Sequence, residues 1–272
     1  MWGDHQIWAN DEDLYPMADA LGIPRDRIVF TNWGLKADWF EQFGHDFVWH
    51  LDDNREEIGA IAQQTKVVPL SCVGGIQFIH KGNKLLTFLS DTHNKHDQIR
   101  AEDLPGGDLI IHCGDFTGRG SFHECEYFIK WFDGLSQYKR KVMIAGNHDF
   151  LFEKAPQLVP SLLKQTEVTY VQDDSVVIGG LRIYGSPWQP EFYNWAFNLP
   201  RNGAELKAKW DAIPSDVDIL LTHGPRFGAL DQVGQRRVGC ELLHEQFESG
   251  RIKPLVHAFG HIHDSYGVIE SG

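Results

Sequence analysis

The chain has 272 residues, a formal net charge of -13 and a hydrophobic fraction of 42%, which is ordinary for a globular protein that can bury a large core. The acidic charge argues against a general binder of nucleic-acid backbones, because such a protein needs a basic face. A small phosphorylated substrate is not excluded, because bound metal ions would reverse the sign of the local field.

The sequence lacks a run of about twenty apolar residues, and its first residues do not resemble a secretory signal, so we expect a cytoplasmic protein without membrane contact. Its four cysteines are scattered and form no CxxC pair, which favours buried reduced thiols over a zinc knuckle or a redox site. They are Cys72, Cys113, Cys125 and Cys240.

The first 66 residues differ in character from the rest, and we expect a small N-terminal α/β module of unknown role there. Helical spacing predicts three short helices, over residues 11–22, 35–43 and 54–63. Strands are expected at Val67–Leu70 and Ile76–His80, on either side of a turn at Gly74-Gly75. The histidines of the module are not expected to be ligands; they are His5, His45 and His50.

From residue 84 onward the sequence alternates between apolar runs and helical patterns, as an α/β fold does. Five apolar runs are typical of buried strands with both sheet faces covered. They are Leu85–Leu89, Leu109–Cys113, Val142–Ala145, Ile219–Thr222 and Leu255–Phe259. Helices are expected over residues 121–136, with Ser121 as the N-cap, and over 203–212 and 237–248. This pattern indicates an α/β domain over residues 67–272.

A short polar motif follows each apolar run. The motifs are Asp91-Thr92-His93, Gly114-Asp115, Gly146-Asn147-His148-Asp149, His223-Gly224 and Gly260-His261-Ile262-His263. Their two leading carboxylates, one amide oxygen and five imidazoles nearly match what two adjacent divalent cations need, with one imidazole to spare. Any one of these side chains could equally cap a helix or satisfy a core hydrogen bond. Five motifs at successive strand ends favour a metal centre at one edge of the fold.

The segment 185–200 is rich in aromatic residues and admits two interpretations. Its side chains could form a wall for a nucleobase or an aryl group, or a small satellite core under a long loop. The second interpretation is preferred for most of them, and Trp188 and Phe192 are the candidates for substrate binding. Arg226 follows a ligand motif and could contact a phosphate oxygen or be a surface arginine, and both interpretations stay open.

Residues 84–271 resemble the calcineurin-like metallophosphoesterase superfamily, whose pattern is D-x-H, G-D, G-N-H-D/E, H and G-H-x-H. Within it the chain is most similar to the metallophosphoesterase-domain-containing class III cyclic nucleotide phosphodiesterases. The matching segments are Leu181–Trp188, Phe197–Pro200, Leu221–Pro225, Arg237–Cys240, Gly260–His263 and Tyr266-Gly267. The resemblance implies a four-layer α/β/β/α sandwich. The stretch 18–25 resembles a small bacterial domain of the DUF4031 type.

The same resemblance implies the roles of the motif residues. One metal ion would be held by Asp91, His93, Asp115 and His263, and the second by Asp115, Asn147, His223 and His261. His148 would protonate the leaving oxygen or stabilise charge on it, and Asp149 would orient His148 through its ring nitrogen. A metal-bridging hydroxide would be the nucleophile. Manganese or iron is favoured, and zinc, nickel or cobalt fit the mixed N/O ligands as well.

We therefore expect a two-metal phosphodiesterase acting on small phosphodiesters such as 2′,3′- or 3′,5′-cyclic nucleotides. A phosphomonoesterase, a nucleotide pyrophosphatase and a nucleotide-binding scaffold with weak activity are the alternatives. The presence of His261 speaks against the scaffold, because some animal members of the group carry glycine at that position. Stable nucleic-acid binding is not expected, and homo-oligomer formation is left open. Because the family continues further after Tyr266-Gly267, strands within 67–80 are expected to cover an otherwise open sheet edge.

Overall fold

The computed structural model describes residues 49–52, 68–71, 77–81, 84–100, 104–265 and 267. Several predicted features lie outside the described residues: the helices over 11–22, 35–43 and 54–63, the turn at Gly74-Gly75, His5, His45 and Cys72. None of the helices in the described part has the length and apolar character needed to span a bilayer.

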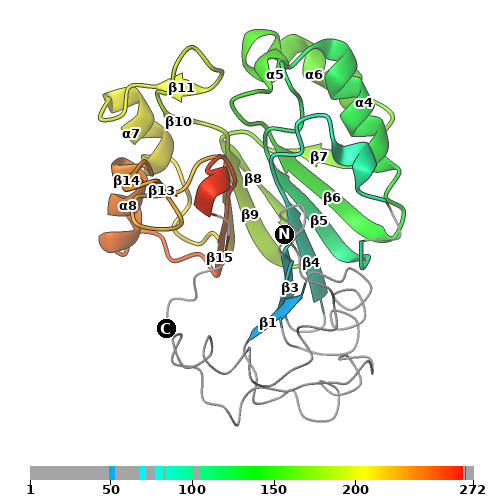
Figure 1. The fold of residues 1–272 in the computed structure, drawn as a ribbon, viewed down its shortest axis with the longest axis horizontal. Helices are drawn as coiled ribbons and strands as arrows, with labels where there is room; N and C mark the ends of the chain where they lie inside the picture. Colours follow the sequence, from blue (N-terminus) through cyan, green and yellow to red (C-terminus); the bar gives the residue numbers. More distant parts are fainter. Residues whose placement is uncertain are drawn as a thin grey trace, which may run out of the picture.

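The larger sheet has seven strands in the order in which they occur along the chain (Figure 1). They are β1 (Trp49–Asp52), β2 (Val68–Ser71), β3 (Gln77–Lys81), β4 (Lys84–Leu89), β5 (Gly107–Cys113), β6 (Tyr138–Ile144) and β7 (Val168–Tyr170). Strands β4 to β7 are parallel, whereas β3 pairs antiparallel with β4 and with β2. The two strands predicted before residue 81 are confirmed, and they extend the sheet beyond the edge of β4.

The second sheet has four strands in the order β15, β12, β9, β8. They are β8 (Asp174–Ile178), β9 (Leu181–Ser186), β12 (Ile219–Thr222) and β15 (Val256–Ala258). Strands β9, β12 and β15 are parallel, and β8 is antiparallel to β9. Two short ribbons complete the strands: β10 (Gln189–Pro190) with β11 (Asn198–Leu199), and β13 (Gln232–Val233) with β14 (Arg236–Arg237).

The two sheets pack face to face, and helices cover the outer face of each (Figure 1). The larger sheet carries α4 (Phe122–Asp133), α5 (Phe150–Lys154) and α6 (Val159–Leu163), and the second carries α7 (Ala204–Asp211) and α8 (Glu241–Glu248). Single-turn 3-10 helices lie at His96–Gln98, Pro156–Leu158 and His263–Ser265. The chain therefore has the expected α/β/β/α arrangement of four layers.

Alternation along the strands divides the core between these layers. On β4, Leu86 and Phe88 join the cluster between the sheets, whereas Leu85 and Leu89 face the cluster beneath α4. A third cluster, centred on Trp210, lies between the second sheet and its helices. Because β4 and β12 are buried on both faces over most of their length, they read as continuous apolar runs in the sequence.

Local signals set the helix boundaries where they are strong. Ser121 caps α4 in a capping box with Glu124, as the sequence predicts. The predicted helix over 237–248 is wrong at its start, because α8 begins only at Glu241. The residues before it pair in β14 and in the loop that follows, where the Val238 amide donates to the Asp231 carbonyl at 2.9 Å.

Candidate metal centre

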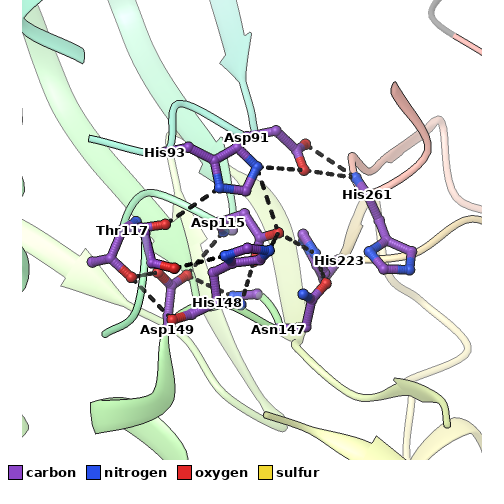
Figure 2. Close-up of polar contacts among 12 residues, drawn as sticks. Asp91, His93, Asp115, Thr117, Asn147, His148, Asp149, His223 and His261 are labelled. Carbon is purple, nitrogen blue, oxygen red and sulfur yellow. Dashed lines mark hydrogen bonds and ion pairs between the residues drawn. The ribbon is translucent and has the colours of Figure 1, made fainter. Parts of the chain in front are cut away.

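The motif loops follow the carboxyl ends of strands from both sheets and meet at one site (Figure 2). The first three motifs follow β4, β5 and β6 of the larger sheet, and the last two follow β12 and β15 of the second. The centre is therefore built from two sheets, and its residues come from loops up to 172 positions apart in sequence, as between Asp91 and His263.

The backbone of these loops is strained at the residues that carry the polar side chains. Asp91, His93, Asp115 and His261 have φ of 54°, 42°, 57° and 70°, a left-handed region that non-glycine residues rarely occupy. Cross-loop hydrogen bonds hold this geometry: the Asp91 amide donates to the Gly114 carbonyl and the His93 amide to the Asp115 carbonyl, both at 3.0 Å. Strain of this kind clusters at functional sites, where the surrounding structure maintains it.

The carboxylate of Asp115 lies at the middle of the cluster and is only 2% exposed. Its Oδ2 atom is 3.3 Å from His223 Nε2 and 3.8 Å from His93 Nε2. Its Oδ1 atom accepts a hydrogen bond of 2.7 Å from the His148 amide. One carboxylate oxygen thus faces histidines that belong to different sheets, as a group that bridges two cations must.

Three overlapping groups of possible ligands surround Asp115. The first consists of Asp91, His93 and His263, the second of Asp115, His223 and His261, and the third of His93, Asp115 and His148; within each group the ligand atoms lie within 4.8 Å of one another. Asn147 adds its Oδ1 atom, 3.0 Å from His223 Nε2. The structure brings together all the side chains predicted as metal ligands. Their division between two ions stays a prediction.

The electrostatics of the cluster suit cation binding. Burial opposes ionisation of Asp91, yet hydrogen bonding to His263 and the nearby His223 hold the pKa of Asp91 well below its usual range. Burial lowers the pKa of His93, and lowers that of His261 to about 4, so their rings are neutral near pH 7 and can offer lone pairs.

His223 behaves differently from its neighbours. Its ring is fully buried, which by itself would lower its pKa, but the carboxylates of Asp115 and Asp91 raise the pKa to about 9. Its Nδ1 atom pairs with the Cys113 carbonyl at 3.0 Å, and its Nε2 atom faces the oxygens of Asp115 and Asn147. A positive charge is thus favoured where these two oxygens converge. The donor set, with its ionised carboxylates and the neutral imidazoles of His93 and His261, fits divalent cations.

His148 projects its ring toward the same cluster. Its Nδ1 atom pairs with the Gly118 carbonyl at 2.8 Å, and its Nε2 atom lies 4.0 Å from Asp115 Oδ2. The predicted pairing of the His148 ring with Asp149 is wrong, because a backbone carbonyl takes that place. The sequence does not indicate this partner, because it is a backbone carbonyl and not a side chain.

Asp149 instead links the motif loops through hydrogen bonds that its carboxylate accepts from their backbone. Its Oδ2 atom accepts from the amides of Asp115 and Gly146, both at 2.8 Å. Its Oδ1 atom accepts from the amide of Thr117 at 3.0 Å and from the Thr117 hydroxyl at 2.7 Å. Burial and the Asp115 carboxylate raise the pKa of Asp149, and the four donors oppose that rise. The completely buried carboxylate positions the loops and does not face the cluster.

The aromatic segment divides into packing residues and residues at the site. The Trp188 indole donates to Asp173 at 2.8 Å and packs edge-on against Phe197, so we assign Trp188 to packing and not to a substrate wall. Phe192 is 51% exposed, and its ring centroid is 6.1 Å from that of His261, which keeps it as a candidate. Trp195, which the sequence favoured as a packing residue, stacks on His148 with ring centroids 4.0 Å apart.

Arg226 points toward α8. Its guanidinium donates to His244 Nδ1 at 3.0 Å and lies 4.9 Å from the centroid of the Phe247 ring. These contacts favour a structural arginine over a phosphate ligand.

Comparison with known proteins agrees with this geometry. The model of the calcineurin-like phosphoesterase family matches residues 84–265. The chain belongs to this family, and the resemblance found in the sequence is confirmed. Metallophosphoesterase domain-containing protein 1 of Homo sapiens is 43% identical over 210 residues, which cover 68% of this chain and 62% of that protein.

Two further matches are more distant. UPF0046 protein T07D4.2 of Caenorhabditis elegans is 37% identical over 205 residues, covering 65% of this chain and 51% of that protein. The solved structure of TT1561 from Thermus thermophilus covers 64% of this chain and 80% of its own, with 16% identity and a TM-score of 0.47, too remote for any functional conclusion. The chain spans 62% of the human protein and 51% of T07D4.2.

Proposed function

We propose that this domain is a two-metal phosphodiesterase that hydrolyses small phosphodiesters, with cyclic nucleotides as the natural substrate class. The observation that carries the proposal is the buried Asp115 carboxylate, which lies among histidine and aspartate side chains from the loops of both sheets. When bound, the two divalent cations supply a nucleophile from water at neutral pH and neutralise charge on the phosphoryl oxygens.

The protein's own contribution is a rigid arrangement of donors. Asp91, His93 and His263 would hold one cation, Asn147, His223 and His261 would hold the other, and Asp115 would contact both. Their two-sheet framework fixes the distance between the ions before substrate arrives. Such preorganised positioning is a major source of rate enhancement in phosphoryl transfer.

His148 is suited to protonating the leaving oxygen. Because its Nδ1 atom is engaged by the Gly118 carbonyl, only Nε2 is available to exchange a proton with a substrate. That atom faces the same space as Asp115 Oδ2, 4.0 Å away. A general acid must stand within hydrogen-bond reach of the group that it protonates, and this position beside the proposed ions satisfies that need.

The charge and the rim of the site support a small diester. Two carboxylates against two dications leave a net positive site, which attracts a phosphate anion despite the acidic chain. Phe192 and Tyr193 are 51% and 77% exposed beside His261, and their rings could contact a base or an aryl group.

Turnover by the full chain tests the proposal. Protein stripped with chelator is reloaded with manganese, iron, zinc, nickel or cobalt in turn. It is then assayed on bis-p-nitrophenyl phosphate, p-nitrophenyl phosphate, 2′,3′- and 3′,5′-cyclic AMP and a dinucleotide pyrophosphate. We expect metal-dependent cleavage of the diesters, with Asn147→Ala and His148→Ala each losing at least about 100-fold in kcat.

Matched controls are Asn202→Ala and His123→Ala, which change exposed residues of the same types and should retain wild-type turnover. Equal activity in wild type, Asn147→Ala and His148→Ala would overturn the proposal. If the enzyme cleaves the monoester or the pyrophosphate faster than the diesters, the proposed metal centre stands and the proposed substrate class is wrong. Nucleotide binding without turnover under every metal would favour a scaffold.

A further inference from the structure

The stacked pair of Trp195 and His148 has a role beyond packing. We propose that Trp195 is a positioning residue that holds the His148 ring in the orientation from which its Nε2 atom serves the leaving oxygen. This inference rests on the proposed function for its catalytic consequence, but the restraint on the ring can be measured without turnover.

Three contacts restrain the His148 ring from three directions. The Trp195 ring covers one face, with centroids 4.0 Å apart and planes inclined by 27°. The His93 ring meets it edge-on, at 4.5 Å and 75°. The Gly118 carbonyl fixes the Nδ1 edge at 2.8 Å. The hydrogen bond alone leaves the ring free to tilt about that bond, and the indole removes this freedom.

Trp195 is itself fixed to the loop that carries His148. The amide of Ala196 donates to the Asn147 carbonyl at 3.0 Å, which fastens the aromatic segment to the loop bearing both Asn147 and His148. The next residue, Phe197, is completely buried, and its carbonyl accepts from the Gln189 amide at 3.0 Å. The indole is therefore anchored through the residues that follow it to the loop that carries His148.

A role as a substrate wall is less suited to Trp195 than to its neighbours. Trp195 is half-buried and has one face occupied by His148. Phe192 and Tyr193 of the same segment are far more exposed. We therefore expect loss of Trp195 to affect the chemical step, because a misplaced proton donor slows turnover without weakening the binding of substrate.

The kinetic test compares Trp195→Leu, which removes the stack, with Trp195→Phe, which keeps an aromatic face. The substrates are bis-p-nitrophenyl phosphate and methyl p-nitrophenyl phosphate, which share a leaving group and differ in the group that remains. We expect Trp195→Leu to lower kcat on both by about threefold to tenfold, with KM nearly unchanged and substantial recovery in Trp195→Phe. Tyr127→Leu, which changes an exposed aromatic residue on α4, should retain wild-type kcat.

Two further measurements separate positioning from other effects. In a His148→Ala background, Trp195→Leu should cause no additional loss, because the residue acts through His148. In the metal-free protein, carbethoxylation of His148 by diethyl pyrocarbonate, followed by peptide mass spectrometry, should be faster in Trp195→Leu than in wild type and Trp195→Phe.

The outcomes are distinguishable. If wild type turns over no diester but His148 becomes more reactive in Trp195→Leu, the proposed function fails and the restraint on the ring stands. Unchanged reactivity of His148 would overturn the inference. A rise in KM confined to the bis-aryl substrate would also overturn it, because it would make Trp195 a substrate wall.

Discussion

Replacing Asp149 with asparagine should destabilise the domain strongly, although this residue does not face the ligand cluster. Its two carboxylate oxygens accept four hydrogen bonds, from the amides of Asp115, Gly146 and Thr117 and from the Thr117 hydroxyl. Asparagine keeps one accepting oxygen and replaces the other with an amino group, which only donates. Asp149→Asn therefore tests whether the loops depend on a side chain whose two oxygens both accept hydrogen bonds.

The magnitude follows from counting the donors that lose their partner. If the amino group turns toward Thr117, the hydroxyl can rotate to accept, and one buried N–H stays unpaired. If it turns the other way, the amides of Asp115 and Gly146 are both unpaired. Each orphaned buried donor costs about 1–3 kcal/mol. We expect a loss of about 2–4 kcal/mol in the free energy of unfolding, or roughly 4–16 °C in Tm for a domain of this size.

The assay is thermal unfolding of the chelator-treated protein, followed by circular dichroism, so that metal binding cannot mask the change. Asp216→Asn is the matched control, because the Asp216 side chain is 68% exposed in an ion pair with Arg182 and such surface pairs contribute little. A Tm for Asp149→Asn within about 2 °C of wild type would refute the reasoning, since it would mean that the buried donors find other partners.

Three further predictions concern the metal centre and its surroundings. A Cβ on Gly260 would overlap the Asp91 carboxylate, whereas a Cβ on Gly224 would make ordinary contact, 3.7 Å from the His261 ring. In calorimetric titration, Gly260→Ala should therefore bind manganese at least about tenfold more weakly than Gly224→Ala. Equal manganese affinities of the two variants would contradict the geometry. Burial lowers the pKa of His112 to about 3, so this histidine is protonated in the unfolded chain before it is protonated in the folded one. The free energy of unfolding should therefore fall as pH drops below about 6.5, by up to about 1.4 kcal/mol per pH unit. Urea unfolding at pH 7 and pH 5.5 should show a smaller loss of this free energy in His112→Gln than in wild type, and an identical loss would argue against a neutral buried ring. Phe192→Ala should raise KM for bis-p-nitrophenyl phosphate by about threefold to tenfold with kcat retained, and an unchanged KM would remove this ring from the substrate site.

The strands and the ligand cluster could be predicted because their signals are local. A strand that is covered on both faces requires a continuous apolar run such as Leu109–Cys113. The polar residue that follows the run, here Asp115 after a glycine, can be recognised as a candidate ligand from its position at the carboxyl end of the strand. Parallel strands then bring such residues together whatever their separation in the sequence.

Other features could not be predicted because they depend on backbone groups or on loop closure. The partner of the His148 ring is the carbonyl of Gly118, a group that every residue possesses. The stack of Trp195 on His148 follows from a hydrogen bond between Ala196 and the loop of Asn147, and neither the length nor the composition of the aromatic segment indicates it. The start of α8 at Glu241 is not evident from the sequence, because the two-residue strand β14 takes residues that fit the helical pattern.

A centre whose ligands come from both sheets has a mechanical consequence for the domain. Ions bound at this position would link the two sheets, so any movement that separates the sheets would also open their coordination. By linkage, a free ion at about one hundred times its dissociation constant would add about 2.7 kcal/mol against unfolding. Conversely, a remote substitution that loosens the packing between the sheets should speed the release of the ions without touching a single ligand.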